Sequence, residues 1–383
     1  MSNTMTALAP ILWSVAQKIP RELTGVLGAV TLDFDDKGVA LNDSVKVPIV
    51  AQGSSSTYTP AMTTTAGSDN TPTTASIVIN NSNQYTWNVT GEQERSLLNG
   101  GDNAKEFMRQ NMEQGVRTLV NAIESRAYVV ACTNASRAIG TAGTTPFASA
   151  ITVGSQTLQI MLDNGLTDVD NLTQVLSTSG GQNLRALVTI NGQFPGSTAQ
   201  DMLTSGILSV IYGIKYRESA QTAISTKGTG TSYTVAASTQ TIGATTLTGI
   251  LAGSGTIVAG DIITFAGDTN KYVVVSSVGG STVTSITIGA PGLRTAVAAS
   301  SAITVGANFT PMPLIHRKGI VTVVRPPIIP ESPLIQQLPL TDPQTGLSMT
   351  FCRIVGDGMT TYRLVVMDGT AAVQTNTTAI LLG

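Results

Sequence analysis

The stretch from residue 226 to residue 308 constrains the fold most, because it is dense in strand signals and almost free of charge. Its five charged residues are Lys227, Asp261, Asp268, Lys271 and Arg294. Short strands with regular turn signals predict a small β-barrel or sandwich. The sequence changes character on both sides, so we predict a β-domain inserted into another domain. The expected strands span residues 232–237, 261–267, 271–278, 281–289 and 302–306.

One tight turn is expected inside this stretch. Val278 and Ser281 flank the glycine pair Gly279-Gly280. Two glycines accept the positive φ angles that two-residue hairpin turns require. We therefore predict a hairpin between the third and fourth of these strands.

The whole chain is poor in charge. Only 11% of its 383 residues are Asp, Glu, Lys or Arg, whereas roughly 25% is usual for a soluble protein. A free monomer keeps itself soluble with surface charge, so the composition indicates that much of the surface faces other protein. The net charge is −2, which gives no basic excess for nucleic-acid binding as a primary role, although the fold can still form a local patch.

The cysteines and the apolar runs exclude some classes of protein. Cys132 and Cys352 are far apart in sequence and form neither a disulfide framework nor a metal motif, so we expect two buried thiols. The N-terminus lacks the pattern of a secretory signal, and no apolar run reaches the roughly 20 residues that a membrane span needs. We therefore expect synthesis in a cytoplasm and no membrane span.

The N-terminal region is expected to be an arm. Apolar residues between positions 6 and 28 have helix-like spacing that Pro10 and Pro20 interrupt, which predicts a helical turn or two. The carboxylates of residues 33–38 resemble the start of a calcium loop. However, Lys37 and Ser44 occupy positions where such a loop needs oxygen ligands and a closing Glu. We expect an ordinary acidic turn there.

A long β-hairpin is expected next. Residues 44–52 and 77–89 both have strand patterns, and Asp69 is the only formal charge between residues 53 and 91. The segment between the two strands is rich in threonine. Two strands around a Thr-rich tip predict a hairpin that projects from the body.

The following segment predicts a long amphipathic helix. Between residues 104 and 130, apolar residues recur at intervals of three or four, which predicts about 30 helical residues that Asp102 can cap. Gly115 in the middle permits either a bend or a close approach. Arg109, Glu113 and Arg117 lie four apart on another face, which is typical of a solvated face and here also of a subunit contact.

The remaining sequence predicts mixed α/β structure. We expect a helix at 155–165, a strand at 185–191, a short helix at 198–206 and a strand at 207–219. Residues 311–327 predict a helix-like turn followed by a strand. The C-terminal segment predicts two strands around Asp357-Gly358 and a closing strand.

No catalytic, cofactor-binding or metal-binding residue can be identified. His316 is the only histidine, so no site with several histidine ligands can form, and no nucleophile motif accompanies it. The Gly228–Gly230 and Gly253–Gly255 pairs lack the spacing of phosphate-binding loops. We predict a structural role for His316 and a protein that is not an enzyme.

Three segments resemble a known family. They are SGILSVIYGIKYRES at 205–219, PLIHRKGIVTVVRPP at 313–327 and YRLVVMDGTAAVQTNTTAILLG at 362–383. With the order of arm, hairpin, long helix and interrupted α/β region, the chain resembles the major capsid proteins of tailed phages. It is most similar to the coat proteins of short-tailed phages like P twenty-two.

The resemblance implies an α+β Hong Kong ninety-seven type capsid fold with an inserted small β-barrel domain. It also implies seven parts: 1–44, the N-terminal arm; 45–91, the extended loop and peripheral β-structure; 92–149, the spine helix and peripheral domain; 150–225, the first part of the axial domain; 226–308, the inserted β-barrel domain; 309–345, the second part of the axial domain; and 346–383, the C-terminal strands of the peripheral domain.

The implied function is self-assembly into an icosahedral shell around double-stranded DNA. The resemblance implies homo-oligomeric hexamers and pentamers in a virion capsid that is assembled in the host cytoplasm. Scaffolding protein, portal and a decoration protein are the implied partners, with no sequence-specific DNA contact, no cofactor and no membrane. The inserted domain then serves folding support or shell stabilisation rather than ligand binding.

Three other functions remain open at this stage. A tail-tube or tail-sheath subunit would also be rich in Thr, Gly and Ala, but the long charged helix followed by an α/β segment argues against it. An encapsulin-like compartment shell shares the fold but generally lacks the insertion. A secreted adhesin fits the barrel-like block, but the sequence lacks a secretory signal, and aromatic residues, at 4%, are scarce for stacking on sugars.

Overall fold

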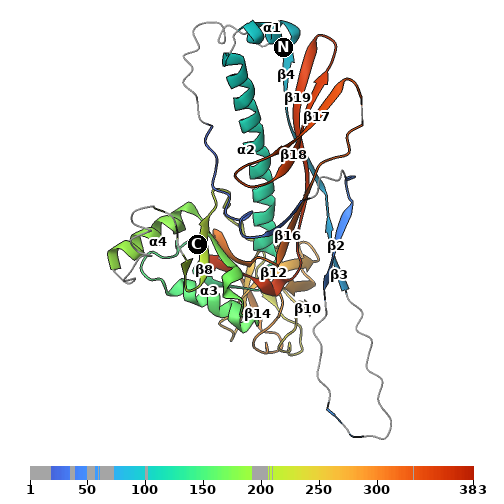
Figure 1. Ribbon diagram of the computed structural model, residues 1–383. Helices are drawn as coiled ribbons and strands as arrows, with labels where there is room; N and C mark the ends of the chain where they lie inside the picture. Colours follow the sequence, from blue (N-terminus) through green and yellow to red (C-terminus); the bar gives the residue numbers. More distant parts are fainter. Residues whose placement is uncertain are drawn as a thin grey trace.

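The computed structural model describes residues 19–34, 39–49, 57, 58, 60, 73–99, 102–191, 206, 208, 210–330 and 332–383. An elongated part, built around one long helix, stands on a broader part that holds most of the shorter elements (Figure 1). Four predictions lie wholly or mostly outside these residues: the helical turns expected within residues 6–28, of which the described residues 19–28 contain no helix, the acidic turn beyond Phe34, the Thr-rich tip and the helix at 198–206.

The elongated part contains a six-stranded sheet. Its order is β1 (Thr31–Phe34), β16 (Ile320–Arg325), β19 (Met359–Ala372), β18 (Ser348–Val355) and β17 (Ile335–Thr341), and β4 (Asn81–Thr90) also pairs with β19. The β4–β19 ladder runs from Asn81 opposite Asp368 to Thr90 opposite Met359. The predicted C-terminal strand pair around Asp357-Gly358 is confirmed as β18 and β19.

Helix α2 (Asp102–Thr133) lies along this sheet, after the short helix α1 (Gly91–Asn99). The prediction of a helix of about 30 residues is confirmed, since α2 has 32. Its buried stripe packs against Leu364 and Val366 of β19, which forms one continuous core. The residues of α2 in that core are Val116, Leu119, Val120, Ile123, Ala127, Tyr128, Ala131 and Cys132.

Gly115 provides a close approach between α2 and the sheet. A Cβ atom at this position would lie 2.6 Å from Leu364 Cδ1 and 2.8 Å from Tyr85 Cδ1. Real side chains do not come this close, so the absence of a side chain sets the distance between helix and sheet. Of the two roles open to Gly115, the structure supports the close approach.

The broader part contains a second, mixed sheet. Its first six strands run in the order β7 (Val210–Ile211), β8 (Ile214–Glu218), β6 (Leu172–Leu176), β15 (Pro311–His316), β20 (Thr378–Leu382) and β5 (Arg137–Gly140). Helices α3 (Thr152–Asp163) and α4 (Thr178–Asn191) and the 3-10 turns Val169–Asn171 and Thr375–Thr377 complete it. The expected helix at 155–165 and the closing strand are confirmed.

The predicted strand at 185–191 is wrong, because these residues form the second half of α4. The helix starts after Ser177, whose hydroxyl accepts a hydrogen bond from the Gly180 amide at 3.2 Å. Leu184 and Leu187, three residues apart, are both buried in the core of this part. The helical spacing of these leucines and the cap outweigh the strand-like run of β-branched residues that follows.

Two further predictions need correction. Residues 311–316 are the buried strand β15 rather than a helix-like turn. β6 pairs with β15 only from Leu314 onward, so Pro311 and Pro313 lie where β15 has β20 alone as a neighbour. The single strand expected at 207–219 is a hairpin of β7 and β8, in which Tyr212 and Gly213 both take positive φ angles.

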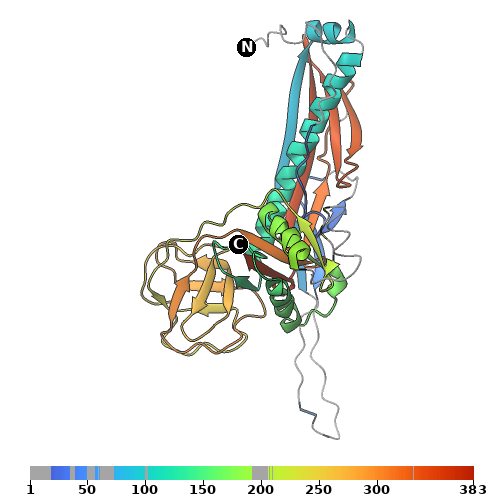
Figure 2. The same cartoon turned by 90° about the vertical axis from the view of Figure 1, so that its left-hand side faces the viewer.

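Residues 226–308 have their own buried cluster, centred on Tyr233, Phe265 and Tyr272, and project to one side in Figure 2. All five expected strands are present, and a sixth, β10, was not predicted. The prediction of a two-residue turn after Val278 is wrong. Gly279 and Gly280 do have positive φ angles, but the loop extends to Thr284 because Val278 pairs with Ser285. The strands are β9 (Tyr233–Thr234), β10 (Thr246–Thr248), β11 (Ile262–Phe265), β12 (Lys271–Val278), β13 (Ser285–Ile288) and β14 (Ala302–Val305).

The two ends of the predicted projecting hairpin also pair. β2 (Ser44–Ile49) and β3 (Thr73–Val78) are antiparallel, from Ser44 opposite Val78 to Ile49 opposite Thr73. The strand pattern expected at 77–89 therefore divides between two elements, since β4 begins at Asn81 and pairs with β19.

We predict that Gly115→Ala destabilises the protein although alanine favours helices. The clash with Leu364 and Tyr85 outweighs the helix propensity gained, so the unfolding free energy falls by roughly 1–2 kcal/mol. Urea denaturation measures this change. Thr118→Ala, at an exposed position of the same helix, is the matched control and should stay within about 0.5 kcal/mol of wild type. A stabilised Gly115→Ala variant would contradict the close approach.

Candidate assembly site

A buried carboxylate joins the elongated and broader parts. Glu124 of α2 is fully buried, and one oxygen accepts the Val26 amide at 2.9 Å while the other accepts the Leu27 amide at 2.8 Å. The Ser219 hydroxyl, just beyond β8, donates to the same carboxylate at 2.7 Å. We call Glu124, Val26, Leu27 and Ser219 the Glu124 clamp. It holds the N-terminal segment and the end of β8 against the long helix.

The environment of the Glu124 clamp shifts its titration. Burial raises the pKa of Glu124 above its ordinary value of 4.5, while the hydrogen bonds from Val26, Leu27 and Ser219 act in the opposite direction. The three hydrogen bonds satisfy the carboxylate, but desolvation of the charge remains the larger effect. At neutral pH the Glu124 clamp therefore serves mainly to position these segments and adds little to the free energy of unfolding.

Arginine pairs fix the N-terminal segment at two more points. Arg21 forms a two-pronged ion pair with Asp342 at 2.5 and 2.9 Å. Glu22 pairs with Arg117 of α2 and accepts a hydrogen bond from Asn121 at 2.7 Å. The Arg117 guanidinium lowers the pKa of Glu22 to about 2. Arg117, expected on a solvated face, thus serves a contact within the subunit.

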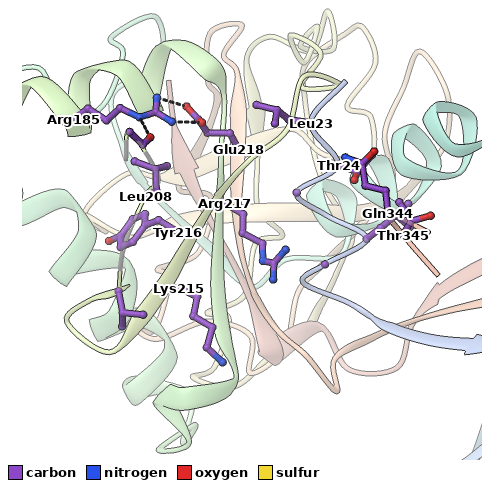
Figure 3. Close-up of a pocket in the computed structure, with 15 residues that line it drawn as sticks. Leu23, Thr24, Arg185, Leu208, Lys215, Tyr216, Arg217, Glu218, Gln344 and Thr345 are labelled. Carbon is purple, nitrogen blue, oxygen red and sulfur yellow. Dashed lines mark hydrogen bonds and ion pairs between the residues drawn. The ribbon is translucent and has the colours of Figure 1, made fainter. Parts of the chain in front are cut away.

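The fixed segment forms one wall of a groove of about 940 Å³ (Figure 3). β8 forms the floor, and Gln344 and Thr345 lie on the same side of β8 as Thr24 of the N-terminal segment. Arg185 of α4 pairs with Glu218 at the upper edge, at 2.8 and 2.5 Å. The Glu124 clamp and the Arg21–Asp342 pair therefore bring three segments that are remote in sequence to one place.

Two basic residues of β8 line the groove and were not assigned a role from the sequence. Ile214 and Tyr216 are buried, whereas Lys215 and Arg217 alternate with them and are exposed. Figure 3 shows the Arg217 side chain directed from β8 towards the N-terminal segment. Among the described residues, neither Lys215 nor Arg217 has an acidic partner. The alternation of apolar and charged residues in IKYRE indicates which side chains are exposed, but it does not indicate that they line a groove.

The residues that the sequence marked for chemistry lie apart from this groove. His316 is buried in β15, its Nε2 is 3.8 Å from Asp168 Oδ2, and neither ring nitrogen has a hydrogen-bond partner among the described residues. Cys132 and Cys352 are both buried, as expected. Burial raises the pKa of each thiol, which disfavours the reactive thiolate. The absence of a catalytic role for His316 stays a prediction.

The glycine pairs that failed the phosphate-loop pattern have packing roles. The Gly230 amide donates to the Thr256 carbonyl at 2.8 Å, and Thr231 bridges to Ser254. A side chain at Gly228 or Gly255 would strike the opposing backbone. In the part of the chain that the structure describes, no group of three or more His, Cys, Asp or Glu side chains could hold a metal ion, and no helix could span a membrane.

Comparisons with known proteins identify the fold. No family model matches the sequence, and no curated protein matches it. A chain from a structure of Mycobacterium phage Che8 matches with a TM-score of 0.50 at 12% identity, over 97% of this chain and 96% of that chain. A chain from the capsid of the cyanophage P-SCSP1u matches with a TM-score of 0.50 at 12% identity, over 100% of this chain and 94% of that chain. The chain has a phage-capsid fold. The expected α+β class is confirmed with it.

We predict that the contribution of Glu124 to the stability of this capsid fold depends on pH. A carboxyl whose pKa is higher in the folded than in the unfolded state binds more protons when folded, so its stabilising effect is lost as the pH rises through that window. Glutamine cannot titrate. We therefore expect the unfolding free energy of wild type minus that of Glu124→Gln to fall as the pH rises from about 4 to about 7, by about 1.4 kcal/mol per unit of pKa difference.

Urea denaturation across that pH range measures the difference. Glu92→Gln is the matched control, because Glu92 of α1 is exposed and has no ion-pair partner among the described residues. Its difference from wild type should stay nearly constant. A wild-type advantage over Glu124→Gln that grows with pH would contradict the direction of the shift.

Proposed function

We propose that this protein is the major capsid protein of a tailed phage and self-assembles into the icosahedral shell that encloses double-stranded DNA. The observation that carries the proposal is the match to a chain of a phage capsid, which extends over 100% of this chain and 94% of that chain. A fold can host several functions, so the proposal also draws on how this chain uses its charges.

The use of charge supports a subunit whose outer surface contacts other protein. Arg126 pairs with the buried Asp368, Arg325 with Asp33, and Arg137 with Asp163. These pairs join segments within the subunit and leave even fewer charges for solvation than the low total suggests. A surface with few free charges is typical of extensive subunit interfaces.

Each part of the chain then has an assigned role. We assign the fold to the Hong Kong ninety-seven type, with 1–44 as arm, 45–91 as extended loop and 92–149 as spine and peripheral domain. Residues 150–225 and 309–345 form the axial domain, 226–308 an inserted β-barrel domain, and 346–383 the C-terminal peripheral strands. The separate buried cluster of residues 226–308 supports the insertion.

The proposed partners follow from the shell. Copies of the chain form hexamers and pentamers, and assembly in the host cytoplasm involves scaffolding protein and portal, with a decoration protein as a further partner. The absence of a basic excess supports enclosure of DNA without sequence-specific contacts. Neither enzymatic activity nor a cofactor is part of the proposal.

Electron microscopy of the purified full-length protein tests the proposal. We expect closed shells of one size. Helical tubes would instead support a tail-tube or tail-sheath subunit, and a stable monomer at high concentration would contradict both. Closed shells that form together with an enclosed host enzyme and without DNA would favour an encapsulin-like compartment.

A second prediction concerns the chain between β2 and β3. Because Ile49 and Thr73 are directly paired, replacing residues 50–72 by an Asn-Gly turn keeps the β2–β3 register. We expect the variant to fold, with a wild-type circular dichroism spectrum. We do not expect it to grow shells, because a shell depends on many weak contacts made together and the extended loop is proposed to supply some of them. Normal particles from this variant in electron micrographs would contradict the proposed role of the extended loop.

A further inference from the structure

Arg217 of β8 is exposed and has no carboxylate partner among the described residues. Its guanidinium lies against Gly28 of the N-terminal segment, where a Cβ atom would be 2.8 Å from Arg217 Cζ. Gly25, three residues earlier, lets the same segment approach the backbone of Glu218, where a Cβ atom would be 2.6 Å from the carbonyl oxygen. The N-terminal segment is thus shaped around β8, and the Glu124 clamp keeps it there.

Most arginines of the described residues, unlike Arg217, donate to a carboxylate. Arg185, its neighbour in the groove, is paired with Glu218. Arg217 keeps a planar fork of N–H donors directed into the groove with no acceptor among the described residues. Arginine forks bind carboxylates in a two-pronged geometry. Arg217 therefore offers the groove a complete set of donors for an anion.

The charged residues that line the groove also favour binding of an anion. Lys215, Arg217 and Arg185 contribute three positive charges to the lining, and Glu218 contributes one negative charge. The remaining polar lining, including Thr24, Gln344 and Thr345, is neutral. A volume of about 940 Å³ suits a short peptide segment.

We propose that the groove binds a carboxylate-bearing segment of a second copy of this chain, with its carboxylate on Arg217. The identity of this occupant rests on the proposed shell function. Charge complementarity supports it, because the groove lining has three basic residues and one acidic residue, and the chain itself exposes acidic residues. Its exposed acids include Glu92, Asp170 and Asp357, which have no cationic partner among the described residues. Every neighbouring copy therefore offers unpaired carboxylates.

The test compares two charge reversals in the full-length chain. Arg217→Glu removes the proposed anion partner. Arg294→Glu is the matched control, since Arg294 is also exposed and has no acidic partner among the described residues, but lies in the 226–308 block outside the groove. Arg217→Gln serves as the milder variant, and circular dichroism with thermal melting identifies which variants are folded.

Binding of a hexaglutamate peptide to unassembled protein is the first measurement. We expect wild type and Arg294→Glu to bind it alike and both Arg217 variants to bind at least about tenfold more weakly, as loss of a charge-assisted pair implies. Equal binding by wild type and Arg217→Gln would overturn the proposal. This measurement does not need shells, so its failure is distinct from failure of the proposed function.

Assembly and DNA binding complete the test. Light scattering against protein concentration should show that Arg217→Glu needs at least about tenfold more protein to assemble, while Arg294→Glu assembles like wild type. Unchanged assembly of Arg217→Glu would overturn the choice of a second copy. Weaker binding of Arg217→Glu to duplex DNA, with unchanged assembly and peptide binding, would reassign the groove to phosphate and also overturn the proposal.

Discussion

The three hydrogen bonds to the buried Glu124 carboxylate are the interaction on which the rest of the arrangement depends. They join the long helix to two backbone amides of the N-terminal segment and to the end of β8. They add to the packing of Val26 and Leu27, which are buried in the same core as the apolar stripe of α2. The N-terminal segment and the end of β8 therefore meet the long helix at one polar side chain.

This coupling has an energetic cost that is consistent with a positioning role. Burial of a carboxylate is unfavourable even when its hydrogen bonds are complete, which is why burial raises the pKa of Glu124. An apolar residue would stabilise a helix core more simply, but it could not bind two backbone amides. Asp368 shows the same combination, because burial raises its pKa and Arg126 forms an ion pair with it. In both places a buried charge fixes the relative position of two segments.

The sequence predicted the elements whose patterns are long and local. The 32-residue helix α2 has an uninterrupted apolar stripe, and β12 keeps strand character over its whole length. Helix α4 was missed because its β-branched residues resemble a strand, whereas its cap at Ser177 and its buried leucines are weaker signals. β15 was missed because prolines at 311 and 313 argue against a strand, and only the fold shows that the pairing of β15 with β6 begins at Leu314, beyond both prolines. Tertiary context decides both cases.

The groove could not be predicted because its walls come from three segments that are remote in sequence. The sequence shows the alternation in IKYRE and the glycines Gly25 and Gly28, but only the fold places Arg217 over Gly28.

A cryo-electron-microscopy reconstruction of the purified particles is the most direct test of the account. It should show this subunit tiling a closed icosahedral shell, with an acidic side chain of a neighbouring copy on Arg217. A helical tube, or a shell in which the groove faces only solvent, would contradict it.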